Sequence, residues 1–441
     1  MNRLNLLNGL NKYPRASLDC YQGWRDDRSV ISVHEALNLI LNQISALPAE
    51  QVPILQAAGR VLCEEVRARR CVPPFANSAM DGYAVRWQDV AQASAASPAS
   101  LRVLESVPAG YLARRRISER TAIKIMTGAP LPAGADTVVR VEHTEAVGDN
   151  VRVNQVDGRG SHIREAGEDI QKGQTLLEKG RVLTPADIGL LASVGKSRVR
   201  VCRRPTVGVI STGDELQEIG DRPRPGKIVN SNSYTLAAAI QETGAIPVTL
   251  GIVRDKRKSL AAVFKKALRF DVLMASGGIS VGDYDLVKEA LGDVGVEMRF
   301  WHVAQKPGHP MAFGRIGRKP VFGLPGNPVS SAVSFLLYAR PALLKMMGHK
   351  NLFLPVIRAT LEHEIKKSRG VKEFIRCRLR SEGDRSFASS TGAQGAGMLR
   401  SLSLAQGLIV AGEAQTFLDK GSQVPVILLN HHDLLQNEVG F

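Results

Sequence analysis

The chain has 441 residues and a formal net charge of +16, with 44% hydrophobic and 23% charged residues. This length exceeds what one hydrophobic core usually supports, so we expect three or four domains, and the composition is that of an ordinary globular protein. No apolar run approaches the ~20 residues of a membrane span, and the first residues lack the apolar segment and cleavage site of a secretion signal. We therefore expect a cytoplasmic protein without membrane contact.

The five cysteines are scattered and form no CxxC pair, which argues against a structural zinc site and a disulfide framework. Positive charge is gathered in short clusters at residues 67–70, 114–116, 198–204, 256–258 and 366–369. Nucleic-acid binding is one interpretation, but only 5% of the residues are aromatic and no nucleic-acid-binding motif is present. We favour a solvated surface that also attracts a small polyanion, with no nucleic-acid partner.

Residues 1–29 are polar and aperiodic and are interpreted as a flexible N-terminal extension. Ser32 and Glu35 then form a capping box ahead of apolar residues at helical spacing, which predicts a helix over 33–46. A weaker helix is predicted over 55–63.

A further helix is predicted to start at Thr184, which is followed by Pro185, and to end at Gly195. We expect it to pack beside the helix of residues 33–46. The two segments 30–72 and 163–204 would then form one discontinuous linking domain.

Residues 73–162 show short β-rich runs separated by Gly and Pro turns and predict a β-rich insert domain. Residues 205–350 alternate strands with helices, which predicts a doubly wound α/β domain with a parallel sheet. Its strands are expected at 206–210, 246–250, 272–275, 298–303 and 321–322, and its helices from Ser231 or Asn232 to Glu242, over 259–268, over 284–291, and from Val329 past Pro341. Short β runs return after Asn351, so residues 351–441 are expected to form a small β domain.

The most informative stretch is 271–285, where a short apolar run is followed by Ser276-Gly-Gly-Ile-Ser280 and Gly282. A strand that leads through a Gly-rich turn into a helix exposes backbone N–H groups suited to phosphate. Ligands of doubly wound sheets bind at the carboxyl ends of the strands. The loops 211–216, 305–310 and 323–328 are expected there too, and their prolines predict a largely pre-formed site.

These loops supply different chemistry. Ser211 and Thr212 offer neutral donors for phosphate, whereas Asp214, Glu215, Asp283 and Asp285 offer carboxylates that could reach phosphate through a divalent cation such as Mg²⁺. Asp214 and Glu215 could equally belong to a capped turn. Lys306 is interpreted as an anion contact or a solvated loop lysine, and His309 as a base or a polar loop residue. No GxSxG motif supports a serine nucleophile.

Taken together, these loops resemble the molybdopterin molybdenumtransferase family, which shares its sequence with the E domain of gephyrin. The resemblance covers residues 30–440. Its motifs are Asn77-Ser-Ala-Met-Asp-Gly-Tyr-Ala84, Thr127-Gly-Ala-Pro-Leu-Pro132 with Gly134-Ala-Asp136, Arg164 with Gly167-Glu-Asp-Ile170, Ser211-Thr-Gly-Asp-Glu-Leu216, Ser276-Gly-Gly-Ile-Ser-Val-Gly282, Lys306-Pro-Gly308 and Gly323-Leu-Pro-Gly-Asn-Pro-Val-Ser330.

The resemblance implies a four-domain subunit of a homodimer that uses Mg²⁺. The implied reaction is insertion of molybdate into adenylylated molybdopterin, with release of AMP and formation of molybdenum cofactor. Contact with the molybdopterin adenylyltransferase and with molybdoenzyme-maturation proteins is a further expectation.

The resemblance also implies functional residues. Catalytic roles fall to Asp81, Asp169, Glu215, Asp285 and Lys306, with Glu215 and Asp285 as metal ligands. Together with the loops, it predicts substrate contacts at Ser211, Thr212, Gly213, Asp214, Asn230, Ser276, Gly277, Gly278, Ser280, Gly282, His309, Pro325 and Pro328. Asp81 and Asp169 are far in sequence from the α/β domain, so the family's dimer arrangement would place the active site across two chains.

Two positions depart from the family pattern: Asn230 stands where the family often has Asp, and His309 where it commonly has Lys. Histidine titrates near neutral pH, so molybdate loading is expected to depend more on pH than in relatives with Lys. These two positions keep open a paralogue that binds a pterin or nucleotide without turnover. The resemblance to the gephyrin E domain keeps open a second alternative to the transferase, a non-catalytic dimeric scaffold. Selectivity between molybdate and tungstate is not readable from the sequence.

Overall fold

The computed structural model describes residues 30–278 and 286–429. The chain divides into two compact units: residues 49–201 form one, and the segments before and after them form the other. Within the described residues, no helix is long and apolar enough to cross a membrane.

A seven-stranded sheet forms the centre of the larger unit, in the order β1-β19-β21-β22-β18-β14-β17. The strands are β1 (Val30–Ile31), β14 (Thr206–Thr212), β17 (Ile246–Val253), β18 (Val272–Ser276), β19 (Glu297–Val303), β21 (Pro310–Ile316) and β22 (Lys319–Leu324). The α/β prediction is confirmed, but the sheet is mixed, because β21 runs antiparallel to β19 and β22. β21 was not predicted. It forms a hairpin with β22 through Gly317, which has a positive φ of 55°.

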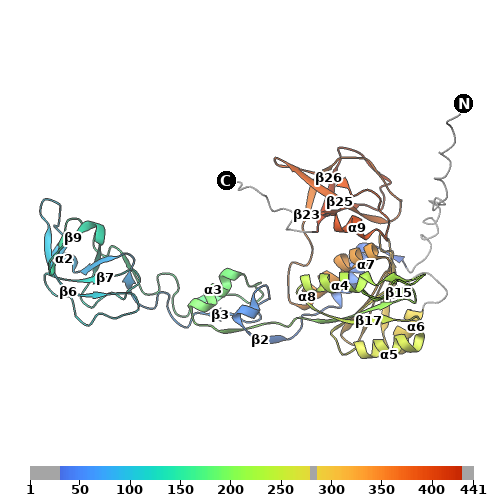
Figure 1. Ribbon diagram of the computed structural model, residues 1–441, viewed down its shortest axis with the longest axis horizontal. Helices are drawn as coiled ribbons and strands as arrows, with labels where there is room; N and C mark the ends of the chain where they lie inside the picture. The colour runs from blue at the N-terminus through green and yellow to red at the C-terminus, as the bar shows by residue number, and fades with distance from the viewer. Residues whose placement is uncertain (1–29, 279–285, 430–441) are drawn as a thin grey trace. The chain divides into compact units, whose positions relative to one another are not determined.

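Helices cover both faces of this sheet (Figure 1). On one face lie α1 (Val33–Asn42), α4 (Ser231–Glu242), α7 (Pro328–Ser334), the π-helical segment η4 (Phe335–Ala339) and α8 (Arg340–Met346); on the other lie α5 (Arg257–Ala267) and α6 (Leu286–Asp293). Successive residues of a strand point to opposite faces. Val209 of β14 accordingly packs in the first core and Ile210 in the second.

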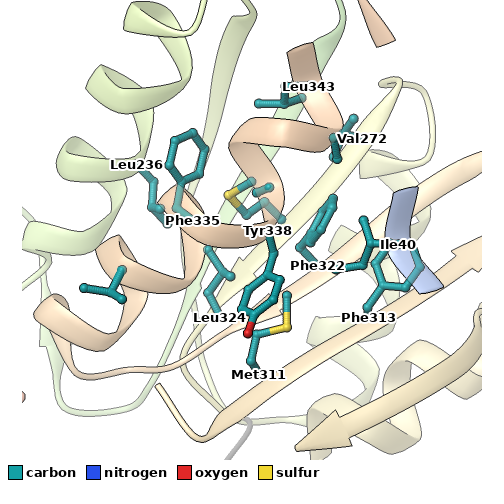
Figure 2. Close-up of a cluster of buried hydrophobic side chains, with 14 of the residues drawn as sticks. Ile40, Leu236, Val272, Met311, Phe313, Phe322, Leu324, Phe335, Tyr338 and Leu343 are labelled. Carbon is teal, nitrogen blue, oxygen red and sulfur yellow. The ribbon is translucent and has the colours of Figure 1, made fainter. Parts of the chain in front are cut away.

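Figure 2 shows the first core, in which Phe335 and Tyr338 of η4 lie among side chains of the sheet such as Phe322 and Leu324. The helix passes Pro341, as predicted. A proline inside a helix removes one hydrogen bond and crowds the preceding turn, and here the wider π-helical turns directly precede the segment that contains it.

The predicted packing of the first helix is wrong. α1 packs on α8, η4 and β19, and Lys345 Nζ donates to Leu41 O at 2.7 Å. The reason is tertiary: β1 adds to β19 as a parallel strand and so holds the start of α1 on the α/β sheet. The linking region of residues 30–72 and 163–204 therefore lacks its expected first helix.

A six-stranded sheet in the order β20-β25-β26-β23-β29-β27 forms the C-terminal part of the larger unit. Its strands are β20 (Gln305–Lys306), β23 (Val356–Leu361), β25 (Lys372–Glu382), β26 (Arg385–Ser390), β27 (Gly407–Ala411) and β29 (Gln423–Leu428), with β24 (Ile365–Lys366) paired to β28 (Phe417–Leu418) and a short helix α9 (Leu399–Ser403). β20 comes from the loop that follows β19, so the chain around Lys306 is bound into this C-terminal sheet.

The smaller unit contains a second six-stranded sheet, in the order β8-β5-β7-β6-β10-β9. Its elements are β5 (Gly82–Val85), α2 (Trp87–Val90), β6 (Ala99–Val107), β7 (Thr121–Ile125), β8 (Thr137–Arg140), η3 (Val141–His143), β9 (Thr144–Val147) and β10 (Asn150–Val153), with β4 (Asn77–Ser78) paired to β11 (Ile163–Arg164). This sheet lies within the predicted β-rich insert.

The rest of the smaller unit is built from β2 (Ala49–Pro53), the 3₁₀ helix η2 (Ile54–Ala57), β3 (Val66–Arg67), β12 (Thr175–Leu177), α3 (Pro185–Ser193) and β13 (Arg198–Cys202). α3 has the predicted cap, since Thr184 and Asp187 form a capping box. The predicted helix over 55–63 is wrong: only η2 forms, because the backbone leaves helical geometry at Ala58, where ψ is 133°, and Gly59 follows with a positive φ of 73°.

Candidate functional site

A pocket opens at the carboxyl ends of β14 and β18, where ligands of such sheets bind. Its lining comes from four chain segments: Ser211, Thr212, Glu215 and Leu216; Ile228, Val229, Asn230, Ser231 and Asn232; Ser276 and Gly277; and Gly326 with Pro328. These segments include predicted contacts from three loops and the start of α4.

Asn230 fixes the start of α4 and one wall of the pocket. Helix α4 was predicted to be capped by Ser231 or Asn232, but the cap is Asn230, whose Oδ1 accepts from Ser233 N at 3.2 Å. Ser211 Oγ also donates to Asn230 Oδ1, at 2.9 Å. Asn230 is 2% exposed. Asparagine therefore serves as the cap here, a role that Asp would fill equally well.

A second set of hydrogen bonds joins α4 to the two loops opposite. Asn232 Nδ2 donates to Ser276 Oγ and to Gly326 O, both at 2.8 Å. Ser276 Oγ contacts Pro325 O at 3.2 Å. Three loops that are far apart in the sequence are thereby held as one surface.

The Gly-rich turn brings its backbone close to β14. Gly277 and Gly278 have positive φ values of 93° and 66°, and a Cβ at Gly278 would lie 2.7 Å from Thr212 Oγ1. Only glycine fits such a turn without strain. Thr212 is 2% exposed, and its hydroxyl has no hydrogen-bond partner among the described residues. A buried hydroxyl without a partner is costly, so a polar ligand atom is the natural partner for Thr212.

Carboxylates gather beside this turn. Glu215 lines the pocket, and its carboxylate lies against Gly213, where a Cβ would meet Glu215 Oε1 at 2.6 Å. Asp255, after β17, was not predicted. Burial raises the pKa of Asp255, and the nearby charges of Asp214 and Glu215 raise it further. A lone Asp after an edge strand carries no sequence signal; only the parallel pairing of β14 with β17 reveals it.

Only part of the predicted metal site lies within the described residues. Ser280, Gly282, Asp283 and Asp285 lie outside the described residues. Among the residues that are described, no group of three or more His, Cys, Asp or Glu side chains is arranged to hold a metal ion.

Lys306 and His309 do not line this pocket. Lys306 Nζ lies 3.5 Å from Glu373 Oε1, on the neighbouring strand β25. The His309 ring Nδ1 lies 2.8 Å from Val303 O, and the ring stacks on that of His302 at 5.1 Å between centroids. His309 is therefore held by its surroundings rather than free in a loop.

Arg376 of β25 is a functional candidate that the sequence did not reveal. Its side chain is fully buried. Nη2 donates to Gly395 O at 3.2 Å, but Nε and Nη1 have no partner among the described residues. Burial lowers the pKa of Arg376. A buried guanidinium with two unsatisfied nitrogen atoms is suited to an anion with several oxygens.

Asp81 and Asp169 belong to the smaller unit and are both exposed. Thr127 donates to Asp81 Oδ1 from its backbone N at 2.7 Å and from its hydroxyl at 2.8 Å. These two hydrogen bonds lower the pKa of Asp81, so the carboxylate is held ionised and in a defined orientation.

Models of known families match three parts of the chain. Residues 31–195 match the "MoeA N-terminal region (domain I and II)", residues 208–345 a "Probable molybdopterin binding domain", and residues 358–429 the "MoeA C-terminal region (domain IV)".

Relatives that match over most of their length belong to the same family as these models indicate. The chain is 39% identical over 403 residues to molybdopterin molybdenumtransferase 2 of Mycobacterium tuberculosis, covering 90% of this chain and 98% of the relative. It is 35% identical over 408 residues to the molybdopterin molybdenumtransferase of a Nostoc species, covering 90% and 94% of the two chains. The crystal structure of the molybdopterin biosynthesis MoeA protein of Pyrococcus horikoshii is 34% identical, with a TM-score of 0.78 over 90% of this chain and 99% of that one. On these matches, the chain belongs to the molybdopterin molybdenumtransferase family.

Proposed function

We propose that this protein inserts molybdate into adenylylated molybdopterin, with cleavage of the phosphoanhydride and release of AMP, to give molybdenum cofactor. The observation that carries the proposal is the pocket beside β14 and β18. There the buried Thr212 hydroxyl has no hydrogen-bond partner among the described residues, and Gly277 with its positive φ of 93° lies in the pocket lining beside it.

The pocket suits a phosphoanhydride. The N-terminus of α4 contributes Ser231 and Asn232 to its lining, and a helix N-terminus favours negative charge. The hydroxyls and amides around it are neutral, and they are already oriented by hydrogen bonds to one another. Such a site binds phosphate at little cost in ordering its own side chains.

Mg²⁺ is proposed to bind beside this pocket at Glu215, which lies in its lining. Burial raises the pKa of Asp255, and the negative charges of Asp214 and Glu215 add to this effect; carboxylate oxygens are preferred Mg²⁺ ligands. Glu215 would hold the ion together with Asp285 and phosphate oxygens. When bound, Mg²⁺ would neutralise charge that develops as the anhydride is cleaved.

Arg376 is proposed to receive molybdate, and Lys306 to hold phosphate of the substrate. Lys306 pairs in register with Glu373 of β25, whereas Arg376, three residues further along that strand, faces the opposite side of the sheet from Glu373. The two unsatisfied guanidinium nitrogens of Arg376 can each donate to an oxygen of the tetrahedral anion.

The active protein is proposed to be a cytoplasmic homodimer in which Asp81 and Asp169 of one chain complete the site of the other. The smaller unit carries these carboxylates on a separate core from the pocket. Contacts with the molybdopterin adenylyltransferase and with molybdoenzyme-maturation proteins stay part of the proposal.

The test is a turnover assay with adenylylated molybdopterin, molybdate and Mg²⁺ that follows AMP release. We expect molybdate-dependent AMP release, abolished by Asp81→Ala and by Asp285→Ala. Thr212→Val, which keeps the shape but removes the hydroxyl, should weaken binding of the adenylylated substrate. Tight pterin binding without AMP release would contradict the proposal and identify a binding protein without turnover.

A further inference from the structure

A cluster of cations lies on β3 and β13 of the smaller unit. In both strands and the residues that follow them, the alternate residues are buried and apolar, whereas the exposed ones are Arg67, Arg69, Arg198 and Arg200. Strand alternation alone explains why these arginines face solvent. It does not explain why arginines from two segments 130 residues apart come together, or why they share one concave surface.

The shared surface is a pocket lined by Gln51, Arg67, Arg69, Val194, Gly195, Lys196, Ser197 and Arg198. A further guanidinium, that of Arg70, lies over Gly195: a Cβ there would collide with its Nη2. Gly195 has a positive φ of 76° and follows the last turn of α3. Glycine at this position thus ends the helix and also leaves room for Arg70.

Only part of this charge is compensated. Lys196 pairs with Glu64 at 3.2 Å, and Arg67 pairs with Glu65. In the described part of the chain, no carboxylate lies within ion-pair distance of Arg69, Arg70 or Arg198. A solvated strand face would tolerate one such arginine at little cost, but three uncompensated guanidinium groups around one pocket repel one another.

We propose that this pocket binds an oligophosphate group. Guanidinium groups present a planar fork of donors that matches phosphate oxygens, and several of them around a cavity match several linked phosphates. No aromatic side chain lines the pocket, so neither a nucleotide base nor a single-stranded nucleic acid finds a stacking surface there. An oligophosphate group occurs both in inorganic triphosphate and in nucleoside triphosphates. The proposal is that the pocket recognises the phosphate chain, whichever of these molecules carries it.

Isothermal titration of the full-length protein with sodium triphosphate, in low and moderate salt, tests the proposal. The double variant Arg69→Gln/Arg198→Gln should weaken triphosphate binding about tenfold or more, because each substitution removes a charged donor. The matched control is Lys265→Gln/Lys266→Gln, which removes the same charge from exposed positions of α5. The control should stay within about twofold of the wild type. Both doubles change exposed side chains and should keep the wild-type melting temperature.

Three further arms separate the alternatives. Arg376→Lys changes the proposed molybdate site and should leave triphosphate binding unchanged, so this inference and the proposed function fail independently. ATP should bind about as tightly as triphosphate if the phosphate chain is recognised; binding of ATP alone would overturn the proposal. Binding of a single-stranded oligonucleotide without binding of triphosphate would overturn the proposal in favour of a nucleic-acid surface. Equal losses of triphosphate affinity in the two double variants would also overturn it, because they would show that only the overall charge of the protein attracts triphosphate.

Discussion

At the residue scale, Arg376 gives the sharpest test of how molybdate is bound. A lysine would keep the charge but replace the planar fork with a point charge. We expect Arg376→Lys to raise the KM for molybdate about tenfold or more while the KM for adenylylated molybdopterin stays near its wild-type value.

The matched control is Arg378→Lys, two residues further along β25, where the side chain is exposed. It should leave both KM values unchanged. If Arg376→Lys instead lowers kcat with both KM values intact, the arginine does not bind molybdate in the ground state.

Asp271 is a residue whose contribution is to stability. It accepts bonds from Arg203 Nη1, Thr206 N and Thr206 Oγ1, each at 2.8 Å. Burial opposes its ionisation, but these hydrogen bonds outweigh burial and lower its pKa to about 2. Because the folded pKa lies below the unfolded value of about 3.9, its ionised form stabilises the fold fully above about pH 4, and this contribution is lost as the pH falls toward 2.

We therefore expect Asp271→Asn to lower the free energy of unfolding at pH 7 by about 1–3 kcal/mol. The difference from wild type should shrink below about pH 4. Urea denaturation followed by circular dichroism over a pH series measures both. Asp293→Asn, which removes an exposed partner of Arg257, should cost less, and an Asp271 effect that grows on acidification would refute the assignment.

At the scale of elements, the loop 306–309 is held between two sheets. β20 pairs with β25 of the C-terminal sheet, whereas His309 directly precedes β21 of the α/β sheet. Gly308 joins them with a positive φ of 94°, and a Cβ there would lie 2.6 Å from Ser334 Oγ and 2.7 Å from Gln305 Nε2.

Gly308→Ala is expected to destabilise the protein by about 2–4 kcal/mol, from the strained φ together with the clash, and to reduce turnover by displacing Lys306. Gly317→Ala separates the two causes, because Gly317 also has a positive φ but open space around it. It should cost about 1 kcal/mol and leave activity intact. Equal losses of stability in the two variants, measured by thermal unfolding, would mean that the contacts at Gly308 add nothing.

The elements that could be predicted are those with local causes. The capping boxes at Ser32 and Thr184 start helices where expected because a cap involves only four neighbouring residues. The packing of α1 could not be predicted, since it follows from the pairing of the two-residue strand β1 with β19, more than 250 residues later. β21 was hidden because it opens with a proline and contains a glycine, Gly314, both of which normally mark loops.

The residues of the candidate site also divide into those with a local sequence signal and those that depend on distant parts of the chain. Thr212, Gly277 and Glu215 could be found because they lie at or shortly after the carboxyl ends of buried strands, where a doubly wound sheet places its ligands. Asp255 and Arg376 could not: each is a single polar residue whose neighbours come from another strand or a distant loop. Asn230 was predicted as a contact and lies in the pocket lining, and its side chain also caps α4, which was not predicted.

At the scale of the whole molecule, the smaller unit is an insertion in the larger one. Arg203 N donates to Pro48 O at 3.1 Å, so the chain leaves the larger unit and returns to it at neighbouring points. An insertion joined in this way can fold as its own unit. In the proposed homodimer Asp81 and Asp169 of one chain complete the pocket of the other, and two-fold symmetry would then give two equal sites.

This arrangement predicts complementation between two inactive variants. Asp81→Asn disables the smaller unit's contribution, and Glu215→Gln disables the pocket. If each site combines the smaller unit of one chain with the pocket of the other, a heterodimer of the two variants has one fully intact site and one with both defects.

Heterodimers purified through two different affinity tags should then recover about half of the wild-type rate of AMP release, while each variant homodimer stays inactive. If a site were built within a single chain, every site of the heterodimer would carry one defect. Purified heterodimers without activity would therefore place Asp81 beside the pocket of its own chain. The matched control for the tags is a dimer of two Asp81→Asn chains that carry the two different affinity tags.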